Sequence, residues 1–94
     1  MKKYAAEFIG SFAIVFFGTG AAILNAGQIC VALAFWFIVF LLIIFFGKWS
    51  DAHFNPAVTI AFALVNCFPK KQVIPYIILQ VAGAIAASLI LLII

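Results

Sequence analysis

The sequence predicts an all-α membrane protein in which three transmembrane helices accompany one short re-entrant half-helix. Of the 94 residues, 70% are hydrophobic and only 7% are charged, whereas about a quarter of the residues in a soluble domain are charged. Three apolar runs come close to the roughly 20 residues that a helix needs to cross a bilayer, and a fourth is too short to cross. Because so short a chain cannot hide this much apolar surface by folding on itself, we expect lipid to surround it.

The three long runs lie at residues 4–24, 29–47 and 73–94 of one unit, 1–94. Glu7 is the only charge in the first run, and the second has no polar side chain. The third is interrupted only by Tyr76, Gln80 and Ser88. Each run therefore predicts one transmembrane helix.

The first run also has features of a secretory signal peptide, since Lys2 and Lys3 precede it. The apolar region of such a peptide is uninterrupted and about 7–15 residues long. This run is longer, and Glu7 interrupts its start. We therefore expect it to remain as a membrane helix.

The short apolar run covers residues 56–65, and a polar segment, 66–71, follows it. A helix of this length reaches about 15 Å, half the thickness of the hydrocarbon. It must therefore enter the membrane and return on the same side. Asn55 is a preferred N-cap and Pro56 suits the first helical position, so we expect the half-helix to begin there.

The cap and the residues before it predict a polar path. As a cap, the Asn55 side-chain oxygen would accept the backbone N–H of Val58 or of the residue before it, which leaves the amide NH2 group as a free donor. Non-helical backbone at membrane depth is tolerated only against protein or a water-filled cavity. We therefore expect the segment Ala52-His53-Phe54 to line a wet path with its carbonyl groups.

Several strings of the sequence resemble the aquaporin and glycerol-facilitator family, also called the major intrinsic proteins. The resemblance follows the order of that family's elements and covers essentially the whole chain. It rests on Ala6-Glu7-Phe8-Ile9-Gly10, Phe16-Phe17-Gly18-Thr19-Gly20, Val31-Ala32-Leu33-Ala34-Phe35, Ala52-His53-Phe54-Asn55-Pro56-Ala57-Val58-Thr59, and Tyr76-Ile77-Ile78-Leu79-Gln80 with Gly83-Ala84.

The resemblance implies one of the two inverted repeats of such a channel, namely the N-terminal half with a single NPA motif, Asn55-Pro56-Ala57. In the family, two such motifs meet at mid-membrane and orient water or small neutral solutes. Carried over, Asn55 is a pore donor, the carbonyl groups of Ala52, His53 and Phe54 are pore acceptors, and Glu7 braces the loop. A complementary half and a tetramer are the implied partners.

The family also takes a selectivity aromatic from its second helix, and Phe35 stands at the matching place, 55 − 35 = 20 residues before Asn55. Phenylalanine there resembles the water-selective members. Trp36 and Asp51 depart from the family, which commonly has glycine at both positions. Trp36 points about 100° away from Phe35 on a helix, so we do not expect it to be the selectivity aromatic. The family's second NPA motif and selectivity arginine do not occur in these 94 residues.

The charges indicate orientation and exclude other classes of function. The five cations are Lys2, Lys3, Lys48, Lys70 and Lys71. They flank the apolar runs without forming a basic stripe, so no nucleic-acid partner is expected. All five fall on one side of the membrane if the first and third runs lead outward, and the connector 25–28 has no charge. This bias predicts a multi-pass protein of the cell membrane with a cytoplasmic N-terminus.

No catalytic set, paired carboxylates or metal-ligand spacing occurs in the sequence, so we expect neither an enzyme nor a bound metal or cofactor. The expected function, from the resemblance, is half of a passive channel for water or a small neutral solute that needs a complementary half. The alternative is a truncated, non-conducting fragment or accessory subunit. A self-assembling, holin-like pore would need amphipathic helices, which the uniformly apolar run 29–47 does not provide.

Overall fold

The computed structural model describes residues 2–25 and 27–94, and it confirms the all-α fold class. Met1 and Ala26, which belong to the expected unit 1–94, lie outside the described residues. The elements in order are α1 (Lys2–Ala13), η1 (Ile14–Thr19), α2 (Gly20–Ile23), α3 (Gln28–Phe46), α4 (Pro56–Leu64), η2 (Lys70–Gln72) and α5 (Val73–Ile93). No strand occurs in either described range.

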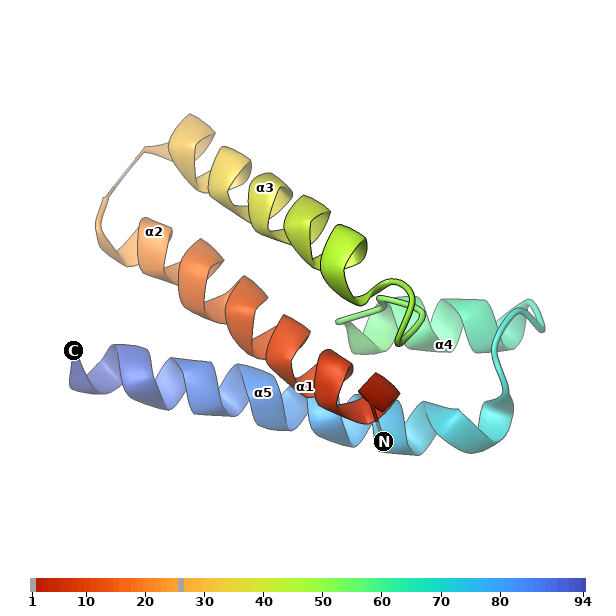
Figure 1. The fold of residues 1–94 in the computed structure, drawn as a ribbon. Coiled ribbons are helices and arrows are strands. Elements are labelled where there is room, and N and C mark those ends of the chain that lie inside the picture. Colours follow the sequence, from red (N-terminus) through yellow and green to blue (C-terminus); the bar gives the residue numbers. More distant parts are fainter. Residues whose placement is uncertain (1, 26) are drawn as a thin grey trace.

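Three continuous helical segments are long and apolar enough to cross a membrane: Lys2–Ile23, Gln28–Phe46 and Lys70–Ile93. The corresponding expected ranges were 4–24, 29–47 and 73–94. In Figure 1, α1 and α5 run side by side in the same direction, and α3 returns beside them in the opposite direction. One end of the bundle therefore holds the starts of α1 and α5 and the end of α3.

The first span is not a uniform α-helix. Ile14–Thr19 form a π-helix, η1, between α1 and α2. A π-helical turn uses i→i+5 hydrogen bonds and changes which residues face a neighbouring helix. Hydrophobic periodicity gives no sign of this local widening, so the sequence predicted only a single helix there. Gly18 is the buried residue of the segment.

The interior of the bundle is more polar than its surface. The buried polar side chains are Glu7, Ser11, Ser50, His53, Thr59 and Gln80. Large apolar side chains are exposed along all three spans, with Phe17 55%, Ile44 58% and Ile78 60% exposed. A protein in water does the reverse. The arrangement is that of a chain solvated by lipid, with its costly polar groups turned inward.

Small residues allow α1 and α5 to approach closely. Ala6, Gly10, Gly83 and Ala87 are all buried. A methyl group added at Gly83 would overlap the backbone oxygen of Phe8 and lie 3.1 Å from the backbone nitrogen of Phe12. Such close backbone approach is typical of helices packed in membranes.

The half-helix α4 packs against α5 and starts at mid-depth in the bundle (Figure 1). The hydroxyl of Ser11 donates to the carbonyl of Phe54, the residue before the cap, at 3.2 Å. Ser11 lies 11 − 2 = 9 residues from the start and 23 − 11 = 12 residues from the end of the span Lys2–Ile23. The first turn of α4 is thus level with the middle of the first helix.

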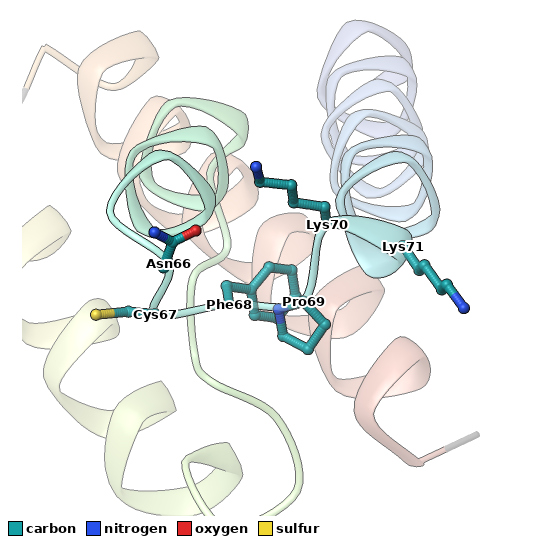
Figure 2. A pocket seen from close by; sticks show the side chains of 6 residues that line it. All are labelled: Asn66, Cys67, Phe68, Pro69, Lys70 and Lys71. Atoms are coloured by element: carbon teal, nitrogen blue, oxygen red, sulfur yellow. The ribbon is translucent and has the colours of Figure 1, made fainter.

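The far end of α4 leads into a turn at the lysine-bearing end of the molecule. Figure 2 shows this turn, where Lys70 and Lys71 extend in different directions at the start of η2. The turn lines an open hollow whose residues are Asn66, Cys67, Phe68, Pro69, Lys70 and Lys71. Because it lies at the opposite end of α4 from Asn55, this hollow is separate from the polar site described next.

Candidate functional site: the half-helix cap and its polar support

Glu7 is the centre of the polar network and is fully buried. Its Oε1 accepts the backbone N–H of Phe54 at 2.9 Å and the side-chain amide of Gln80 at 2.7 Å. Its Oε2 accepts the hydroxyl of Ser50 at 2.8 Å. All three donors are neutral groups. One carboxyl group therefore ties α1 to the loop before α4 and to α5.

Thr59 extends the network into the first turns of α4. Its Oγ1 accepts the Gln80 amide at 3.0 Å and lies 3.0 Å from His53 Nδ1. The His53 ring is buried and stacks on Phe62 with 5.1 Å between ring centroids. The Thr59 hydroxyl also donates a hydrogen bond to the carbonyl oxygen of Asn55, at 3.3 Å. The loop and the half-helix are thus held to each other as well as to α1 and α5.

Asn55 caps α4 in an extended conformation, with φ −157° and ψ 128°. Its Oδ1 accepts the backbone N–H of Ala57 at 2.8 Å, and Pro56 occupies the first turn. Asn55 is exposed, and within residues 2–25 and 27–94 no group accepts a hydrogen bond from its Nδ2. The amide NH2 group is therefore presented outward beside the positive end of the α4 dipole.

The backbone before the cap has an unusual conformation. Ala52 and Phe54 have φ values of 55° and 54°, a region that residues other than glycine rarely adopt. The hydrogen bonds to Glu7 and Ser11 hold Phe54 in this conformation, because a strained backbone persists only where its surroundings fix it. In the described part of the chain, the carbonyl groups of Ala52 and His53 accept no hydrogen bond, whereas that of Phe54 accepts one from Ser11.

Phe35 lies apart from this network, on α3. Its ring packs directly over Gly18 of η1, so closely that a methyl group on Gly18 would overlap it. The neighbouring Trp36 points outward, is 61% exposed and stacks on Phe40 with centroids 5.4 Å apart. Its bulk therefore lies outside the packing of the three helices in the described chain.

Three supporting residues were not predicted as part of the site: Ser50, Thr59 and Gln80. Gln80 appeared only as a polar interruption of an apolar run. A buried amide or carboxyl group within a membrane span needs a partner, and this rule links Gln80 to Glu7. The roles of Ser50 and Thr59 depend on the path of the loop, which residue types alone do not specify.

The fold and the site define a multi-pass membrane protein in which a half-helix brings a polar cap to the middle of a bundle of three membrane-spanning helices. Residues 1–94 match the family described as Major intrinsic protein. The chain is 45% identical over 101 residues to aquaporin Z of Bradyrhizobium diazoefficiens, which covers 100% of this chain and 42% of the relative. It is 44% identical over 101 residues to aquaporin Z of Brucella melitensis, covering 100% of this chain and 44% of the relative.

A third relative is the glycerol uptake facilitator protein-like 6 of Lactiplantibacillus plantarum, 42% identical over 89 residues that cover 94% of this chain and 41% of the relative. The chain therefore belongs to the major intrinsic protein family, a family of channels rather than enzymes. It spans less than half the length of these relatives.

Proposed function

We propose that this chain is one half of a passive channel for water or a small neutral solute, and that it conducts only with a complementary half. The observation that carries the proposal is the cap of α4. Asn55 is exposed, starts a half-helix at mid-depth, and uses only its Oδ1 in the cap. Its NH2 group is then free to donate to a passing solute.

The electrostatics of the cap favour neutral solutes. The N-terminus of α4 carries the partial positive charge of the helix dipole, and a positive helix end in a pore opposes protons and other cations. The carbonyl groups of Ala52 and His53, which have no partner in residues 2–25 and 27–94, are the proposed acceptors. The Phe54 carbonyl contributes a second acceptor position beside its bond to Ser11. Donor and acceptors together would order single-file molecules.

The need for a second half is supported by what surrounds the cap. Asn55 is exposed on the described chain at mid-depth of the bundle, and at the corresponding depth of a bilayer an exposed polar group facing lipid is costly. The relatives are more than twice as long as the matched segment. A complementary half-channel, within a tetramer as the family resemblance implies, would cover the cap and close the path.

Phe35 is the proposed selectivity aromatic. With a large ring at the constriction, water should pass more easily than a polyol. Phe35→Ala should therefore raise glycerol permeability relative to water permeability. An unchanged glycerol-to-water ratio would remove Phe35 from this role.

The test is a chimera in which this chain replaces the matched segment of the Bradyrhizobium diazoefficiens aquaporin Z. Stopped-flow shrinkage of proteoliposomes should show water permeability well above that of protein-free vesicles for the chimera, and none above it for this chain alone. Asn55→Ala should lower the permeability of the chimera severalfold. A folded but non-conducting chimera would support the non-conducting fragment or accessory subunit instead.

The chain alone provides the second arm. If its own proteoliposomes conduct water, and Asn55→Ala abolishes that flux, then the requirement for a complementary half is wrong. If they conduct and Asn55→Ala has no effect, the cap is not the pore site.

A further inference from the structure

We propose that Gly18 is the positioning residue of Phe35 and thereby sets the width of the constriction. This inference rests on the proposed function in one respect, namely that Phe35 borders the path of the solute. The contact itself is a feature of the structure. Gly18 is buried, and its Cα faces the edge of the Phe35 ring at Cδ1, Cε1 and Cζ.

Only glycine fits at residue 18 with the ring in this place. A Cβ atom there would overlap three ring carbons, and all three belong to the side chain of Phe35. A substitution would therefore be accommodated by movement of the ring, which rotates about its side-chain bonds, before any movement of a helix. The ring would move away from η1.

The open side of Phe35 gives that movement a direction. The residue is half-buried and lines an open hollow along α3 with Trp36, Val39, Phe40 and Ile43. A ring displaced from η1 moves toward this open side. If Phe35 borders the solute path, a side chain at residue 18 must alter the constriction without itself reaching it.

Within the π-helix, a glycine and not the neighbouring phenylalanine faces Phe35 of α3. Phe17, the residue before Gly18, is 55% exposed and faces outward. A π-helical turn shifts the facing of the residues that follow it, and such turns are frequent at functional sites. Gly18 lies inside this π-helical segment, directly against the Phe35 ring.

Gly20 supplies a matched control two residues further along the same helical segment. A Cβ atom at Gly20 would meet only Leu91 Cδ2, at an ordinary contact distance of 3.6 Å. Both changes replace glycine by alanine in a helix, which by itself favours the helical state. They differ in the overlap with Phe35.

The experiment compares Gly18→Ala, Gly20→Ala, Phe35→Ala and the double variant Gly18→Ala/Phe35→Ala in the chimera described above. We expect Gly18→Ala to reduce water permeability at least threefold and Gly20→Ala to leave it unchanged. In the Phe35→Ala background, Gly18→Ala should have no further effect on water permeability or on the glycerol-to-water ratio. Equal losses from Gly18→Ala with and without the Phe35 ring would overturn the proposal.

A second readout does not depend on conduction. In detergent, the isolated chain with Gly18→Ala should unfold at a lower temperature than the unaltered chain, and Phe35→Ala should remove that difference. If the chimera does not conduct but this coupling is present, the proposed function fails while the Gly18–Phe35 contact stands. If the coupling is absent, Gly18 does not position the ring, whatever the permeability.

Discussion

Glu7 shows how a single side chain can organise a membrane repeat. Its carboxyl group has three hydrogen-bond donors, from the loop backbone, from Ser50 and from Gln80. In hydrocarbon no water is available to replace a lost partner. Each of these bonds therefore counts for more than the same bond at a water-exposed surface.

The free energy of unfolding should depend on the ability of residue 7 to accept hydrogen bonds. Glu7→Gln replaces one acceptor oxygen by an NH2 donor that faces another donor, and we expect a loss of about 1–3 kcal/mol. Glu7→Leu removes the acceptor of the Phe54 N–H and of the Ser50 hydroxyl and leaves the Gln80 amide only its bond to Thr59, so it should cost more. Chemical unfolding in detergent, followed by circular dichroism, measures both.

Ser88→Ala is a suitable control for the Glu7 variants, because Ser88 is an exposed polar residue of α5. It should leave the free energy of unfolding unchanged. A Glu7→Leu variant as stable as the unaltered chain would contradict the central role of this carboxyl group.

At the scale of single residues, the cap at the start of α4 was predictable from the sequence, whereas the hydrogen bonds that hold the loop before it were not. The cap at Asn55 was predictable because N-cap preference is local and Pro56 follows it. The φ values of Ala52 and Phe54 were not, since nothing in these residue types favours a left-handed backbone. At Phe54 that conformation is held by partners on α1, which are 43 and 47 positions away in the sequence.

Two buried glycines lie at contacts between the helices. Gly83 of α5 lies against the backbone of α1, whereas Gly18 lies against the side chain of Phe35. The two positions should therefore respond differently to an added methyl group, because a side chain can move alone and a helix backbone cannot.

Gly83→Ala should force α1 and α5 apart. Its Cβ atom would overlap the Phe8 carbonyl oxygen, and relief requires movement of a whole helix. Overpacking of this kind costs about 1–3 kcal/mol, and the change should be visible as a lower unfolding temperature in detergent. Gly20→Ala, with space for its methyl group, should be neutral or slightly stabilising. Equal stability of the two variants would mean that the α1–α5 contact is looser than described.

The presence of three membrane-spanning helices followed from hydropathy, but the π-helix within the first span did not. Apolar residues are almost continuous in 4–24, so their pattern does not indicate which side of the helix faces its neighbours. The widening at Ile14–Thr19 becomes understandable only beside α3, where Gly18 meets Phe35. For a helix that contacts lipid on one side, the sequence therefore predicts the length better than the internal geometry.

The whole molecule has a strong asymmetry of charge between its two ends. Lys2 and Lys3 begin α1, Lys48 follows α3, and Lys70 precedes α5, which places these residues at one end of the bundle (Figure 1). We propose that this end is cytoplasmic, because lysine bias in short loops sets orientation.

The two cysteines test this orientation from both sides. Cys67 is exposed in the turn after α4, at the lysine end, and Cys30 is exposed at the start of α3, at the other end. In intact cells, a membrane-impermeant thiol reagent should label a Cys67→Ala variant through Cys30, and should label a Cys30→Ala variant only after the cells are opened. The reverse pattern would invert the proposed topology.

The spacing of the partners of Glu7 along the chain has a consequence for biosynthesis. Phe54 lies 47 positions after Glu7, and Gln80 lies 73 positions after it. A growing chain therefore exposes Glu7 in its first helix well before either partner has been synthesised, and the last partner arrives only with α5. The loop before the half-helix can bond to α1 earlier, but the Gln80 bonds to Glu7 and Thr59 form only after that final helix has entered the bilayer, so insertion of α5 is the step that completes the site.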